Sequence, residues 1–138
     1  MELAHALSSV HWPAVVTAAV STFLIGGLWY SPLLFAKPWM ALNGTSEQEL
    51  QSGNAAFIFG GSFILALCAA LGLALFLGST ATLEFGAAAG FLAGTLWVAT
   101  SLGTTFLFER RPLRLLAIDA SYHVVTFTLM GTILGAWH

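Results

Sequence analysis

The chain has 138 residues, of which 58% are hydrophobic and only 7% are charged, and its mean hydropathy is +0.88. A soluble domain has about 25% charged residues, so four basic and six acidic side chains are too few to solvate a globule of 14.6 kDa. The net charge of −2 excludes the basic field that nucleic-acid binding requires, and the single cysteine, Cys68, excludes an internal disulfide. The composition therefore predicts an integral membrane protein.

Four stretches of the sequence are long and apolar enough to cross a bilayer, which takes about 20 residues in a helix. The first is expected to be retained, because residues 1–11 lack the lysine or arginine that begins a signal peptide. No stretch remains for a soluble domain, so residues 1–138 are predicted to form one all-α membrane domain, a four-helix bundle. The expected helices run from about 12 to 35, 55 to 77, 83 to 108 and 113 to 137.

The positive charges predict the orientation of the bundle. Lys37 lies in the first loop, and Arg110, Arg111 and Arg114 lie in or beside the third. Basic residues concentrate in cytoplasmic loops. Both ends of the chain are therefore expected on the non-cytoplasmic side of a multi-pass protein of the cell's inner membrane.

The first loop is the longest, and it contains a helix start. Ser46-Glu47-Gln48-Glu49 fits a capping box. The second helix is therefore expected to begin near Ser46, outside the membrane, and to run into it with a bend at Gly53-Asn54.

A polar stripe lies on the fourth predicted helix. Asp119, Tyr122, His123 and Thr126 follow the i, i+3, i+4, i+7 spacing of one helix face. A carboxylate costs roughly 2.5 to 3.5 kcal/mol at the centre of a membrane helix, so it should face the bundle interior or water. The stripe predicts a site that handles protons or contacts a solute. The alternatives are a buried hydrogen bond from Asp119 to a histidine or tyrosine that fixes helix packing, or a carboxylate close enough to the membrane interface to reach it. The expected binding residues are Trp29, Tyr30, Trp97, Asp119, Tyr122 and His123.

Glycines recur at four-residue spacing on the third and fourth predicted helices. Such spacing lets another helix approach closely, within the chain or between subunits; a glycine-lined pore is the sharper alternative. These faces and the small size of the chain favour a homo-oligomer. The packing glycines are Gly86, Gly90, Gly94, Gly131 and Gly135.

Charged residues are expected to form a rim at the cytoplasmic surface. Glu109 could pair with Arg114 or Lys37, and Arg110 and Arg111 could contact anionic lipid head groups. The expected rim consists of Lys37, Glu109, Arg110, Arg111 and Arg114.

The titratable residues of the two tails match no metal-binding motif. Glu2, His5, His11 and His138 have no metal-ligand spacing, so neither a metal nor a cofactor is expected. They are interpreted as ordinary tail residues.

Several segments resemble a known family. The sequence Trp-Tyr-Ser-Pro-Leu-Leu-Phe at 29–35 is followed by Lys-Pro-Trp at 37–39. Further segments are Phe-Glu at 108–109, Arg-Pro-Leu at 111–113, Ile-Asp at 118–119, Tyr-His at 122–123, and Met-Gly to Ala-Trp at 130–137. Together they resemble the small bacterial and fungal membrane proteins grouped as domain of unknown function 1761. The resemblance covers nearly the whole chain and implies a four-helix inner-membrane protein with no established activity.

Three functional hypotheses remain open. The first is transport or permeation of a small solute or ion through the polar site. The second is a non-catalytic role as a scaffold, an accessory subunit or a lipid-binding protein. An enzyme ranks third, because Asp119 and His123 could act as an acid–base pair but no nucleophile accompanies them. Membrane lipids are expected partners in every case.

Overall fold

The computed structural model describes residues 2–138, and all regular secondary structure in that range is helical. Four helices of the described chain are long and apolar enough to cross a membrane, which confirms the predicted class of a multi-pass α-helical membrane protein. They are α2 (Trp12–Trp29), α5 (Ala55–Leu77), the helix over Leu83–Glu109, and α8 (Leu113–Ala136).

The third span changes its helical pitch in the middle. It consists of α6 (Leu83–Ala93), a π-helical segment η1 (Gly94–Ala99) and α7 (Thr100–Glu109). A π-helical turn inside an α-helix adds a residue to the local turn and is often found at functional sites. The side chains of α7 therefore point in directions that a continuous α-helix would not give them.

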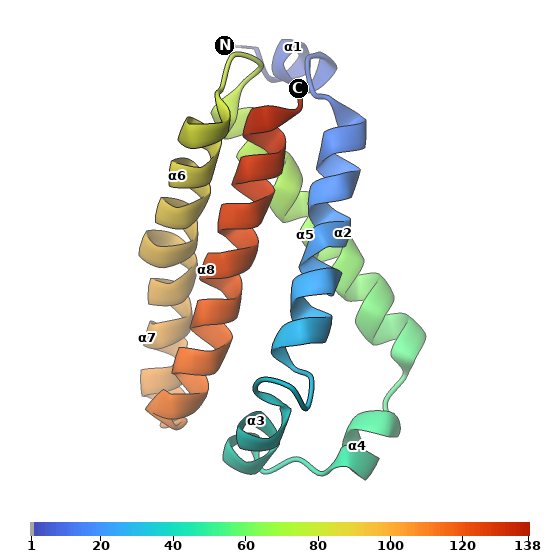
Figure 1. Cartoon of the computed structure of the whole chain (residues 1–138), viewed down its shortest axis with the longest axis vertical. Helices are drawn as coiled ribbons and strands as arrows, with labels where there is room; N and C mark the ends of the chain where they lie inside the picture. Colours follow the sequence, from blue (N-terminus) through green and yellow to red (C-terminus); the bar gives the residue numbers. More distant parts are fainter. Residues whose placement is uncertain (1) are drawn as a thin grey trace.

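The bundle has two distinct ends, shown in Figure 1. The short helix α1 (Leu3–Ser8) and both chain ends lie at the top, here called the terminal end. The short helices α3 (Ala36–Asn43) and α4 (Glu47–Gln51) and the α7–α8 turn lie at the bottom, here called the basic end, because all four basic residues of the sequence fall there.

The first span ends at Trp29 rather than near Phe35 as the sequence predicted. Proline lacks a backbone N–H and disfavours the helical conformation in the residue before it, so Pro32 stops the helix at the Tyr30-Ser31 step. The backbone N–H of Phe35 donates to the carbonyl of Trp29 at 3.0 Å and closes a tight turn. This turn folds α3 back beneath the bundle.

The second span begins at Ala55 and not near Ser46. Ser46 does cap a helix, since its hydroxyl accepts from the backbone N–H of Glu49 at 3.2 Å, but that helix is α4 and ends at Gln51. The side chain of Asn54 accepts from the N–H of Phe57 at 3.1 Å and starts α5 separately. The expected bend is thus a complete break between two capped helices.

The predicted glycines join α6 to α8. A Cβ added to Gly86 would overlap the carbonyl oxygen of Gly131, and one added to Gly90 would overlap that of Phe127. The glycine faces of α6 and α8 pack against each other within one chain, so the two backbones are in direct contact. The homo-oligomer expected from these faces receives no support from them.

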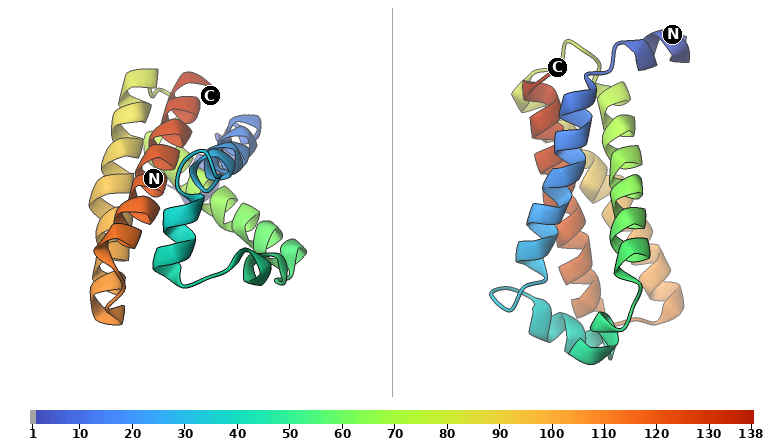
Figure 2. Two further views of the ribbon diagram at one scale, coloured as in Figure 1. Left: turned by 60° about the horizontal axis from the view of Figure 1, so that its bottom comes forward. Right: turned by 90° about the vertical axis from the view of Figure 1, so that its right-hand side faces the viewer.

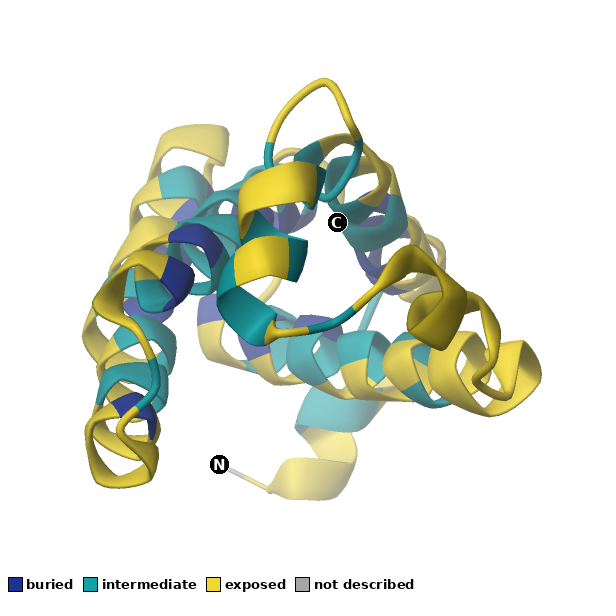
Figure 3. Ribbon diagram, turned by 90° about the horizontal axis from the view of Figure 1, so that it is seen from below, coloured by how far each residue is buried: buried dark blue, intermediate teal, exposed yellow. Residues whose placement is uncertain are grey.

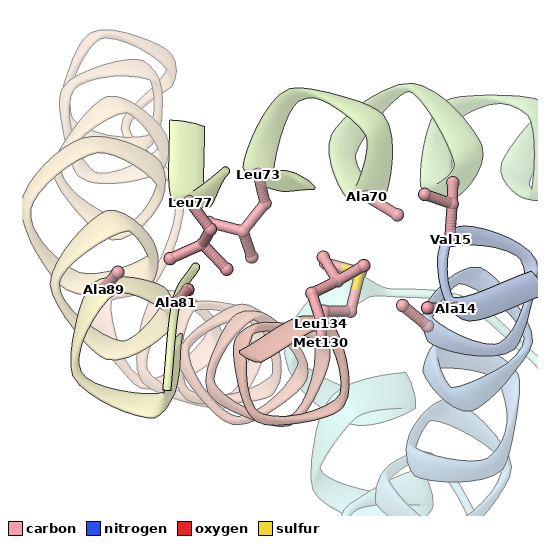
Figure 4. Close-up of a cluster of buried hydrophobic side chains, with 10 residues drawn as sticks. Ala14, Val15, Ala70, Leu73, Leu77, Ala81, Ala89, Met130 and Leu134 are labelled. Carbon is pink, nitrogen blue, oxygen red and sulfur yellow. The ribbon is translucent and has the colours of Figure 1, made fainter. Parts of the chain in front are cut away.

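The apolar core lies in the terminal half of the bundle, where α2, α5, α6 and α8 meet (Figure 4). Toward the basic end α5 diverges from α7 and α8, as Figure 2 shows. Seen from the basic end, the first turns of α5 are exposed on all sides (Figure 3). The polar residues of α8 therefore lie in the half of the bundle that α5 covers least. The core residues are Ala14, Val15, Ala18, Ala70, Leu73, Leu77, Ala81, Ala89, Met130 and Leu134.

Candidate functional site

The aromatic residues at the end of α2 are hydrogen-bonded to α8. The hydroxyl of Tyr30 donates to Oδ1 of Asp119 at 2.8 Å, and the indole N–H of Trp29 donates to the carbonyl of Ile118 at 3.0 Å. These partners come together because Pro32 ends α2 at the depth of Asp119, which leaves Trp29 and Tyr30 beside α8. The two bonds attach the first span to the last.

A third bond runs in the opposite direction. Tyr122 of α8 donates its hydroxyl to the carbonyl of Thr22 in α2 at 3.1 Å, and its ring centroid lies 5.4 Å from that of Tyr30. Trp39 of α3 packs edge-on against Tyr30 at 5.7 Å. We call Trp29, Tyr30, Asp119 and Tyr122 the α2–α8 clasp, because each of them takes part in a hydrogen bond between these two helices.

The clasp depends on Tyr30 remaining a neutral donor. Tyr30 lies one residue beyond the span Trp12–Trp29. Burial raises the pKa of its hydroxyl above the ordinary value, and the hydrogen bond to Asp119 and the charge of that carboxylate raise the pKa further. The phenol therefore stays protonated at physiological pH and acts as the hydrogen-bond donor to Asp119.

His123 faces a different side of α8. Successive residues of an α-helix are rotated by about 100°, so Tyr122 points toward α2 while His123 points toward η1 and α7. There it lines an open groove of about 420 Å³. We call this the His123 groove; its lining residues are Trp97, Val98, Ser101, Leu102, Thr105 and His123.

The His123 groove combines polar and apolar walls. The hydroxyl of Thr105 donates to the carbonyl of Ser101 at 3.2 Å, and Ser101 donates to the carbonyl of Trp97, so both hydroxyl protons are used within the helix while their lone pairs remain available. Trp97 is 64% exposed and meets Phe76 of α5 edge-on at 6.4 Å.

The predicted site is thus divided in two. Trp29, Tyr30, Asp119 and Tyr122 come together in the clasp, whereas His123 and Trp97 lie in the groove. The rings of Tyr122 and His123, 5.1 Å apart, are where the two parts meet. Sequence reasoning missed Trp39, although its place in the Lys-Pro-Trp segment shortly after Trp-Tyr-Ser-Pro was a usable signal, and it did not name Val98 or Leu102.

Among the expected rim residues, Arg111 contacts other side chains. Arg111 donates to Oδ1 of Asn43 at 2.7 Å and places its guanidinium 4.4 Å from the ring centroid of Phe106, a cation–π contact. This brace joins α3 to the α7–α8 turn. The other expected rim residues, Lys37, Glu109, Arg110 and Arg114, are exposed.

A sequence family described as "protein of unknown function (DUF1761)" matches residues 13–135. The chain belongs to this family. The match includes every residue of the clasp and of the groove, so both lie within the part of the chain that the DUF1761 family defines. No curated protein and no solved structure matches the chain.

Proposed function

We propose that this DUF1761 protein binds a membrane amphiphile, a lipid or lipid-like molecule, in the His123 groove. The observation that carries the proposal is the position of His123. The half-buried imidazole lines an open groove within the membrane-spanning part of α8, and its ring nitrogens make no hydrogen bond within residues 2–138. Polar side chains at such depth normally face a partner or an aqueous cavity.

The composition of the groove favours an amphiphile over an ion. His123 and the hydroxyl oxygens of Ser101 and Thr105 can hydrogen-bond a polar head group, while Trp97 and Leu102 offer apolar surface to an alkyl chain. A small ion would make no contact with the apolar side chains of the groove.

The clasp is assigned a structural role in this proposal. Oδ1 of Asp119, the hydroxyls of Tyr30 and Tyr122, and the indole N–H of Trp29 all have partners in the chain. A ligand that accepted a hydrogen bond from Trp29, Tyr30 or Tyr122 would first have to break a bond between α2 and α8. A ligand that bound His123 would break no such bond.

Retention of lipid measured by native mass spectrometry tests the proposal. The protein is released from nanodiscs of phosphatidylethanolamine and phosphatidylglycerol, and the wild type is expected to retain a bound lipid. His123→Leu removes the hydrogen-bonding group and is expected to lower retention several-fold. Asp119→Asn is the matched control, since it alters the clasp and should leave retention unchanged. Equal retention by wild type and His123→Leu would refute the proposal.

Permeation of a small solute is the second candidate. The observation that favours it is η1, because the π-helical turn lies directly beside the groove and such turns accompany functional sites. Flux through the purified protein in liposomes tests this function. A flux that falls with His123→Leu while the melting temperature is unchanged would favour permeation over amphiphile binding.

A further inference from the structure

A second cavity lies at the terminal end, on the opposite side of the membrane-spanning region from the clasp. It has a volume of about 210 Å³ and is formed where α1 and the start of α2 meet the ends of α5 and α8. Its apolar wall includes Leu77, Leu134 and Trp137. Its polar wall contains His5, His11 and His138, the residues that sequence analysis interpreted as ordinary tails.

His11 has an unused polar atom at this cavity. Its Nε2 atom is buried and has no hydrogen-bond partner among residues 2–138. The imidazole packs against Trp137 with ring centroids 5.2 Å apart, which holds its orientation. A buried nitrogen without a partner carries a desolvation penalty, and a ligand in the cavity could remove that penalty by accepting a hydrogen bond.

His138 is held in place by a different contact. Its Nε2 lies 2.6 Å from the carbonyl oxygen of Ala81, so this nitrogen carries a proton and donates it. The contact places His138 beside the α5–α6 loop, in the wall of the cavity.

The cavity walls offer hydrogen-bond donors and no carboxylate, which favours an anion. The lining contains three histidines and no aspartate, glutamate, lysine or arginine. Glu2, which precedes α1, and Glu84, on the first turn of α6, are not among its lining residues. An imidazole N–H can donate a hydrogen bond to an anionic oxygen. The described residues contain no group of three or more potential ligands placed to hold a metal ion.

We propose that this cavity binds the anionic head of a small amphiphile, a carboxylate or phosphate oxygen attached to a short apolar group. The oxygen accepts a hydrogen bond from His11, and the apolar part lies against Trp137 and Leu134. About 210 Å³ is roughly the volume of seven water molecules in the liquid, which admits a monocyclic acid but not a whole phospholipid. His5, His11 and His138 lie outside the residues 13–135 that the family matches.

Titration with benzoate tests this proposal in the full chain, reconstituted in nanodiscs of phosphatidylcholine. We expect saturable binding of benzoate by calorimetry, with a shift of the His11 imidazole ¹⁵N resonance. Benzamide, the neutral analogue, should bind at least tenfold more weakly.

Variants separate this site from the His123 groove. His11→Phe keeps the ring against Trp137 but lacks Nε2, and should weaken benzoate binding at least tenfold. His123→Phe is the matched control and should bind benzoate as the wild type does. If His11→Phe does not fold, His138→Gln, which keeps a donor for Ala81 but removes the imidazole from the cavity wall, should weaken benzoate binding. Unaltered binding by the folded variant, or equal binding of benzoate and benzamide, would overturn the proposal.

The source of the anion is distinguished by the lipid of the nanodisc. If the natural occupant is a lipid head group, phosphatidylglycerol in the nanodisc should compete with benzoate and raise its apparent Kd. If the occupant is a free acid, phosphatidylglycerol should leave the Kd unchanged. Both results support an anion site.

Discussion

At the residue scale, the clasp is a set of three donors, each with an acceptor on the other helix. Trp29 and Tyr122 donate to backbone carbonyls, and Tyr30 donates to the carboxylate of Asp119. Hydrogen bonds between membrane helices average about 0.6 kcal/mol and reach about 1.7. The clasp is therefore expected to stabilise the contact between α2 and α8 without being essential for folding.

Variants of Tyr30 and Asp119 test this role. Tyr30→Phe removes one donor and should lower the free energy of unfolding by about 1 kcal/mol. Asp119→Asn should cost less, because the amide keeps an oxygen that can accept from Tyr30, whereas Asp119→Leu should cost at least as much as Tyr30→Phe. Reversible unfolding in mixed micelles measures all three values. A loss with Asp119→Asn as large as that with Asp119→Leu would show that the charge, rather than the hydrogen bond, is what α8 requires.

At the scale of the elements, α6 and α8 pack backbone against backbone. Gly94, the first residue of η1, continues this contact, since a Cβ added there would lie 3.0 Å from Cα of Val124. Small residues at such a contact let two backbones pack together in the membrane. The pair forms a rigid hairpin that holds η1 and α7 beside His123.

Alanine substitutions measure how tightly this hairpin is packed. Gly90→Ala would force a methyl group against the backbone of Phe127 and should lower the free energy of unfolding by about 1 to 3 kcal/mol. Gly72→Ala on α5 is the matched control, because a Cβ there meets nothing within 4 Å, and it should be neutral or slightly stabilising. Thermal unfolding in detergent compares the two. Similar melting temperatures for both variants would contradict the close packing.

The short helix α3 depends on the brace from Arg111. Arg111→Gln removes the cation–π contact with Phe106 and shortens the reach to Asn43. The amides of Ala36–Asn43 should then exchange hydrogen several-fold faster, because local opening becomes easier. Hydrogen–deuterium exchange with mass spectrometry measures this effect, and Arg110→Gln, at an exposed position, is the control. Protection of α3 that is equal in both variants would argue that the clasp alone holds it.

At the scale of the whole molecule, the two ends of the bundle differ in chemistry. The basic end carries Lys37 and the three arginines together with the exposed start of α5, and the terminal end carries the histidine-lined cavity. With an even number of spans, both termini lie on the same side. The placement of the basic residues predicts that this side is outside the cytoplasm.

Reporter fusions test that orientation. Alkaline phosphatase fused after His138 is expected to be active, and a fluorescent protein that matures only in the cytoplasm is expected to be dark at the same position. Both reporters should give the reverse result when inserted after Gly44 in the first loop. A bright fluorescent fusion after His138 would refute the orientation.

The sequence by itself determined the class of the protein and the number of its spans. An apolar run of about 20 residues in a membrane has to form a helix, because lipid offers no partner for backbone N–H and C=O groups. The packing role of Gly86 and Gly131 could also be predicted, since their spacing has few other uses. The partner of that packing could not, because the same spacing serves contacts within a chain and between chains.

Only the tertiary structure decided how the polar residues are divided. Asp119 and His123 share a face by spacing, yet the early end of α2 at Pro32 brings Trp29 and Tyr30 to Asp119, while η1 and α7 form a groove beside His123. Likewise, His138 is far from His5 and His11 in the sequence, and all three line one cavity because an even number of spans returns the chain to its starting side. Which residues come together depends on where helices end and how they cross, and neither can be predicted from a local pattern of residues.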